Sequence, residues 1–135
     1  MINYEQNRRE LGLHCCVLLE DFHFFNDLDS YIKLIEDFLN YQIDADTFQT
    51  NFYEMKSLTC DKEYRWKTML YIIDNLKLKQ FQGLSSILSK LFTDLDVFEP
   101  DPLLREYYEI DEDELRYFAK EALSKIKTYR TYNDS

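Results

Sequence analysis

The acidic side chains of this chain are concentrated in one short segment. Ten of its 26 Asp and Glu residues lie between Asp94 and Glu114, and Arg105 is the only Lys or Arg among them. With ten acids and one base the segment has a formal charge of −9, whereas the whole chain carries −10. Carboxylates gathered in this way attract a basic protein surface or a cation, and they repel phosphate. The segment is therefore the first candidate for a binding site.

A second set of residues has the chemistry of metal ligands. Its members are His14, Cys15, Cys16, His23 and Cys60. Their spacing matches no zinc finger or ribbon, and adjacent cysteines are awkward ligands for one ion. We therefore expect the thiols to be buried apolar side chains rather than zinc ligands.

The acidic segment also has little in common with a calcium loop. Asp94–Asp96 and Asp111–Asp113 lack the glycine and the terminal bidentate Glu that an EF-hand requires. The chain contains no G-x-S-x-G, P-loop or H-E-x-x-H motif and only two His residues. We therefore expect no metal, no cofactor and no enzymatic activity.

The charge balance narrows the class of partner. Binding to nucleic acid needs clusters of Lys and Arg, and the sequence has none that stands out. Membrane surfaces are anionic and would repel the chain as well. The N-terminal residues lack the apolar core of a signal peptide, no apolar run reaches 18 residues, and three cysteines make no disulfide framework. We therefore expect a cytoplasmic protein whose partner is a basic protein.

The elements that position these acids are predicted to be helices. The 135 residues include only two Gly and two Pro, and 45% of them are hydrophobic. So few breakers disfavour a turn-rich β-sandwich, and this length fits one domain. We predict one all-α domain over residues 1–135, a compact antiparallel bundle of four core helices with residues 1–28 as an N-terminal extension.

Apolar residues at helical spacing give the expected boundaries. Helices are predicted over residues 29–40, 45–55, 61–80 and 84–95, in a final segment after Asp111, and less clearly from about Asn3 to Phe25. In the third of these, the predicted buried stripe is Trp66, Met69, Leu70, Ile73 and Leu76. Gly83 separates two helices, and Pro100 and Pro102 make residues 96–110 an irregular loop.

Helix caps support these boundaries. Asp44 and Asp61 each precede a predicted helix, and Asp29 or Ser30 can cap the helix over 29–40. Asp111 followed three residues later by Glu114 is an Asp version of the capping box. Capping is thus an alternative role for acids at the end of the acidic segment.

The sequence FEPDPLLREYYEID over residues 98–111 resembles the immunity proteins of the colicin D family, including those of contact-dependent growth inhibition systems. The shared pattern is a Phe-Glu-Pro-Asp loop, then Arg105, then Tyr-Glu-Ile-Asp opening the last helix. The hairpin LIEDFLNYQIDADTFQTNF is similar in kind. The resemblance covers about residues 30–129, and residues 1–28 extend beyond it. The segment over residues 58–82 is longer than the corresponding segment in the shortest members of the family.

The resemblance implies a helical bundle that binds a toxic nuclease domain and blocks its active site. In the colicin D branch the toxin cuts tRNA, and acids of the immunity protein take the place of RNA phosphates. It implies Asp96, Glu99 and Asp101 as toxin-facing acids. With their neighbours, the expected toxin-binding residues are Asp94, Asp96, Glu99, Asp101, Glu106 and Tyr107.

Other readings of these residues stay open. The acids could form a plain solvated loop, and Arg105 could be an internal partner of neighbouring carboxylates. Tyr108 and Ile110 could dock the loop on the core, or Phe98, Tyr107 and Tyr108 could anchor the toxin. The alternative function is an acidic adaptor or regulatory protein with a non-toxin basic partner, and a third is a small metal-dependent enzyme.

Overall fold

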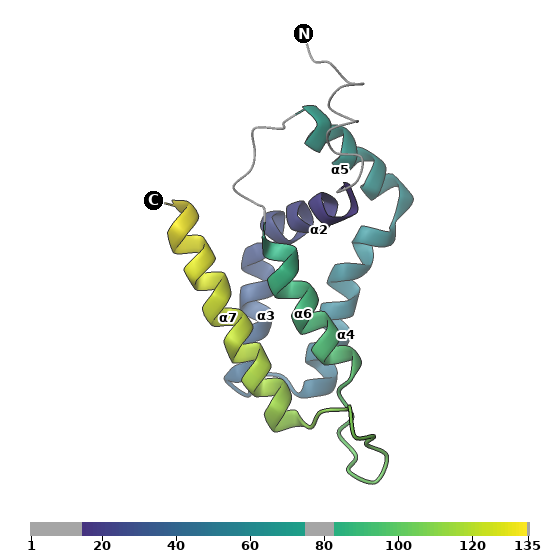
Figure 1. The fold of residues 1–135 in the computed structure, drawn as a ribbon, viewed down its shortest axis with the longest axis vertical. Helices are drawn as coiled ribbons and strands as arrows, with labels where there is room; N and C mark the ends of the chain where they lie inside the picture. The colour runs from purple at the N-terminus through teal and green to yellow at the C-terminus, as the bar shows by residue number, and fades with distance from the viewer. Residues whose placement is uncertain (1–14, 75–82, 135) are drawn as a thin grey trace.

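The protein is an all-α bundle, as the sequence predicts (Figure 1). The structure is a computed structural model, and it describes residues 15–74 and 83–134. Its helices are α2 (Cys15–Asn26), α3 (Leu28–Leu39), α4 (Ala45–Ser57), the short 3-10 helix η1 (Leu58–Cys60), α5 (Lys62–Asp74), α6 (Leu84–Asp96) and α7 (Glu112–Asp134). Within these ranges the β-type pairing is a single isolated bridge, and no helix is long and apolar enough to cross a membrane.

The core lies between α3, α4, α6 and α7. α7 packs against both α3 and α6, and α3 forms a hairpin with α4 (Figure 1). The fully buried side chains of the core include the stacked rings of Phe38 and Phe48, whose centroids are 4.4 Å apart. α2 packs on α5 and α6 and adds Phe24 to the same core, so residues 15–26 are part of the bundle itself.

The predicted caps are confirmed at three helices. Asp44 accepts a hydrogen bond from the backbone N–H of Thr47 at 2.8 Å, and Asp61 accepts one from Tyr64 at the same distance. The exception is α3, which begins at Leu28 after Asp27, so neither Asp29 nor Ser30 caps it. The side-chain bonds of the confirmed caps satisfy N–H groups that have no partner inside the helix, and they fix where those helices begin.

The predicted apolar stripe of α5 is wrong at its first residue. Trp66 is 63% exposed, whereas the side chain of Thr68 is buried. Among the described residues, α5 packs mainly on α2 and η1, and Trp66 lies outside these contacts. Cys60 is also exposed and free, contrary to the expected burial. Residues 75–80 with Leu76, and the side chains of Ile73, His14, Cys15 and Cys16, lie outside what the structure describes.

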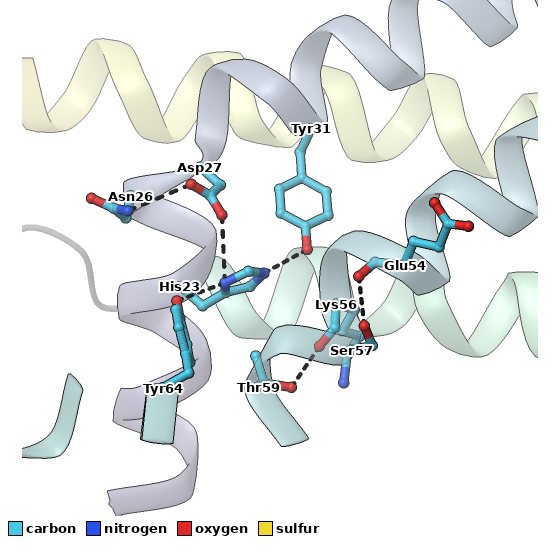
Figure 2. Close-up of polar contacts among 9 residues, drawn as sticks. All are labelled: His23, Asn26, Asp27, Tyr31, Glu54, Lys56, Ser57, Thr59 and Tyr64. Carbon is cyan, nitrogen blue, oxygen red and sulfur yellow. Dashed lines mark hydrogen bonds and ion pairs between the residues drawn. The ribbon is translucent and has the colours of Figure 1, made fainter. Parts of the chain in front are cut away.

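A buried histidine ties α2, α3 and α5 together. The ring nitrogens of His23 lie 2.7 Å from the hydroxyl of Tyr31 and 2.9 Å from that of Tyr64 (Figure 2). Burial lowers the pKa of His23 below its ordinary 6.5, although the carboxylate of Asp27, 3.7 Å away, acts in the opposite direction. The ring is therefore neutral at pH 7, and His23 serves the fold rather than a metal site.

The lowered pKa of His23 predicts a loss of stability in acid. Below pH 6.5 the unfolded chain binds a proton that the folded chain resists, so the free energy of unfolding falls by up to about 1.4 kcal/mol per pH unit from this group. Urea unfolding at several pH values between about 7 and 5 should give a flatter profile for His23→Gln than for the unsubstituted chain. Equal slopes would contradict the assignment.

Candidate functional site

The acidic segment forms a loop that is closed at its base. We call residues 97–111 the acidic loop; it joins α6 to α7 and projects from the end of the bundle opposite the C-terminus (Figure 1). Phe98 and Ile110 pair as an isolated parallel bridge, with Ile110 N–H donating to Val97 O at 2.8 Å and Glu99 N–H donating to Ile110 O at 3.0 Å. Phe98 and Ile110 are both buried, so the base of the loop is part of the core.

Arg105 closes the loop from within. Its Nε donates to the carbonyl oxygen of Glu99 at 2.9 Å, and a terminal nitrogen donates to that of Pro100 at 3.3 Å. Arg105 is thus an internal partner, as one reading expected, but its hydrogen-bond acceptors are backbone carbonyls rather than carboxylates. The guanidinium group also places one positive charge among the acids.

Two of the predicted acids also shape the loop. One oxygen of Asp101 accepts from the N–H of Leu103 at 2.9 Å, and one oxygen of Glu99 accepts from the N–H of Asp101 at 3.2 Å. Glu109 makes a similar bond to the N–H of Glu106 at 2.8 Å. Each of these carboxylates therefore keeps one further oxygen for a partner while the first holds the backbone.

The predicted toxin-binding residues differ in accessibility. Asp96, Asp101, Glu106 and Tyr107 are exposed, with Tyr107 at 98%, and Glu99 is half-buried. Asp94 differs, because it is only 8% exposed and both its oxygens accept from Lys90 at 2.7 and 2.9 Å. Five of the six predicted residues are thus at least partly accessible, and the sixth has an internal partner.

The last four acids of the segment open α7. Asp111 accepts from the N–H of Glu114 at 2.8 Å, and Glu114 accepts from the N–H of Asp111 at 3.3 Å, which confirms the capping box. Glu112, Asp113 and Glu114 lie in the first turn, where the helix dipole favours negative charge. The backbone of α7 thus offsets part of the repulsion between these neighbouring acids.

A basic residue that the sequence did not single out holds this turn against α3. Arg116 bonds Glu112 at 3.2 Å, donates to the carbonyl of Phe38 near the end of α3, and stacks on the rings of Phe38 and Tyr41. Tyr41 has φ of 61°, a left-handed conformation that usually belongs to glycine, and its side chain is exposed. The only sequence signal for Arg116 was its spacing of four residues from Glu112.

Four apolar side chains of the loop are exposed as well. Leu103 is 92% exposed, and Leu104, Tyr107 and Tyr108 are exposed too. The rings of Tyr107 and Tyr108 contact each other edge to face, with centroids 5.5 Å apart.

Two predictions about the apolar residues of the loop can be compared with the structure. Of the residues expected to dock the loop on the core, Ile110 is buried and Tyr108 is exposed. Of the residues expected to anchor the toxin, Phe98 is buried in the core. The sequence signal for Leu103 and Leu104 was an apolar pair inside a loop rich in proline and acids.

The loop has no features of a metal centre. Within the described residues, no three His, Cys, Asp or Glu side chains are grouped so that they could hold a metal ion. The arrangement offers instead a surface of carboxylates and apolar side chains on an ordered backbone. Such a surface can bind a protein that carries positive charge.

Comparison with known proteins gives one match. A family model described as "Bacterial self-protective colicin-like immunity" matches residues 27–126, which include α3, α4, α6, the acidic loop and most of α7. No curated protein and no solved structure matches the chain.

Because Arg105 holds the loop through two hydrogen bonds, we expect the loop to lose order when the Arg105 side chain is removed. In Arg105→Ala, amide hydrogen exchange should accelerate by about tenfold over residues 99–109, since one hydrogen bond contributes roughly 1 kcal/mol to local stability. The core amides of α3 and α6 should be unchanged. Arg105→Lys should give an intermediate result because an ammonium group lacks the planar fork. Unchanged exchange in the loop would show that Arg105 does not hold it.

Proposed function

This chain belongs to the family of bacterial self-protective colicin-like immunity proteins, and we propose that it binds a basic nuclease toxin and covers the toxin's active site with its acidic loop. Membership supports a toxin-neutralising role, and proteins of this family act as inhibitors rather than as enzymes. The nuclease class of the toxin, the acidic loop as the contact surface and occlusion of the active site are our proposal.

The observation that carries this proposal is the separation of charge in the molecule. The ten acids between Asp94 and Glu114 are confined to the end of α6, the acidic loop and the first turn of α7. A nuclease must present cationic side chains to a phosphate backbone, and a set of fixed carboxylates offers the same charge and acceptor chemistry. Opposite charges on the two proteins also accelerate their encounter.

The resemblance of residues 98–111 to the colicin D branch, which includes immunity proteins of contact-dependent inhibition systems, makes a tRNA-cleaving toxin our proposed target. We propose Asp96, Glu99, Asp101 and Glu106 as the acids that face the toxin, with Tyr107 beside them. Asp94 is not among them, since its oxygens already bind Lys90, which neutralises its charge. A toxin that acts on RNA inside the cell would be met in the cytoplasm.

Removing two loop charges without removing their hydrogen bonds tests the contact surface. In Glu99→Gln with Asp101→Asn, the amide oxygens can still accept from the N–H groups of Asp101 and Leu103. Association with the toxin's nuclease domain should slow by about tenfold at low salt, with a weaker dependence on ionic strength. Stopped-flow fluorescence at several salt concentrations measures both.

The matched control removes two acids from another part of the bundle. Glu54 on α4 and Glu63 on α5 are both exposed, so Glu54→Gln with Glu63→Gln makes the same change in net charge. This control should bind almost as fast as the unsubstituted chain. An equal loss in the two double variants would mean that only net charge matters, and no loss in either would contradict the proposed surface.

Co-expression tests the function itself. The C-terminal domain of the toxin gene adjoining this chain's gene should arrest growth and cleave cellular tRNA, and the present chain should restore growth and leave tRNA intact. Growth assays with probing of total tRNA measure both effects. Rescue from a toxin that leaves tRNA uncut would retain immunity and contradict the tRNA target. Failure to rescue would favour the acidic adaptor.

A further inference from the structure

The exposed apolar residues of the acidic loop have no role in charge recognition. We propose that Leu103, Leu104, Tyr107 and Tyr108, which we call the apolar tip, form a preordered anchor that enters an apolar recess within the cationic surface of the toxin. This inference rests on the proposed function, which it deepens: the acids set how fast the complex forms, and the apolar tip sets how long it lasts.

The first support is the degree of exposure. All four side chains fall within six consecutive residues, and Leu103 is 92% exposed and Tyr107 98%. Single apolar side chains on a surface are ordinary, but four large ones within six residues are not, and groups of exposed apolar side chains mark binding surfaces. The buried positions of this loop are taken by Phe98 and Ile110 at its base, so the tip has no place in the core.

The second support is the order of the backbone beneath the apolar tip. The N–H of Leu103 donates to the Asp101 side chain at 2.9 Å, and the N–H of Leu104 donates to the Asp101 carbonyl at 3.0 Å. At the other side of the tip, the N–H of Glu109 donates to the carbonyl of Glu106 at 3.0 Å. Arg105 joins the two halves of the loop through its bonds to Glu99 and Pro100. Little conformational freedom remains to be lost on binding.

The third support is the charge around the apolar tip, which decides what can cover it. Glu99, Asp101, Glu106 and Glu109 lie in the same loop, against a single Arg105. A second copy of this chain would bring the same acids face to face, and an anionic membrane would repel them. An apolar recess with basic side chains around it satisfies both parts of the loop, and the proposed nuclease toxin supplies the positive charge.

The two parts of the surface should affect different rate constants. Exposed charges act over distance and mainly alter association, whereas buried apolar contacts form last and mainly alter dissociation. Tyrosine and leucine side chains that become desolvated do not lose their interaction when salt is added. High salt should therefore weaken the complex without abolishing it.

Surface plasmon resonance with the toxin's nuclease domain, inactivated in its catalytic site, tests the inference. In Leu103→Ala with Leu104→Ala, dissociation should accelerate by about 30-fold at both low and high salt, while association changes by less than about threefold. The control is Leu58→Ala with Trp66→Ala, which removes two exposed apolar side chains from η1 and α5, away from the acidic loop. This control should dissociate at the unsubstituted rate. Circular dichroism verifies that both double variants keep their helices.

The outcomes separate this inference from the proposed function. If the leucine variant dissociates normally while Glu99→Gln with Asp101→Asn associates slowly, the anchor is wrong and the acidic surface stands. If neither variant is impaired, or the domain does not bind the unsubstituted chain, both are wrong. If sedimentation shows that the free chain dimerises and that the leucine variant does not, the apolar tip binds a second copy, and the inference is overturned.

Discussion

The closure of the loop base against the core is the constraint on which the acidic end depends. Phe98 and Ile110 are twelve residues apart in the sequence, and both are buried in the core. The backbone of Ile110 is hydrogen-bonded to Val97 and Glu99, which flank Phe98. Ile110 is followed at once by the capping box that starts α7, and Leu115 then enters the core. Because both ends of the loop are fixed, the acids between them must project from the bundle. Without that closure, the same residues would form a solvated linker whose charges could avoid one another.

Concentrating so much negative charge in one place opposes folding, and the structure offsets it by local means. The first turn of α7 places three acids at the positive end of a helix dipole. Arg105 and Arg116 bond backbone carbonyls and bring positive charge to the same end of the molecule. Lys90 neutralises Asp94, and its ammonium group also lies 4.1 Å from the centre of the Phe118 ring. Glu112 is paired with Arg116, whereas Glu99 and Asp101 accept backbone N–H groups, which leaves their negative charge available for recognition.

The loop combines two kinds of interaction that have different physical ranges. Carboxylates act at a distance that depends on salt, and they discriminate against partners of like charge. Apolar side chains act only at contact, and they contribute most where water is fully excluded. Tyr41, held in a left-handed conformation and stacked on Arg116, adds an exposed aromatic ring near the start of α7. Strain of this kind is commonest where a side chain is needed at a particular place.

The sequence by itself determined the features that depend on neighbours along the chain. Helical periodicity predicted the all-α class and the helix over residues 84–95. Asp44, Asp61 and the Asp111–Glu114 pair predicted three helix starts, because capping involves groups within one helical turn. The charge of the acidic segment was also evident from the sequence, and it predicts a basic partner. That these acids contact a toxin remains a prediction.

Only the tertiary structure decided which side chains are accessible. Trp66 is exposed although its helix packs on α2 and η1, and Asp94 is buried although its partner Lys90, one turn before it, is exposed. Arg105 binds carbonyls rather than acids because the loop folds back on itself, and Phe98 goes to the core while Leu103 stays in water. Burial is set by elements far away in the sequence, and no local pattern reports how those elements pack.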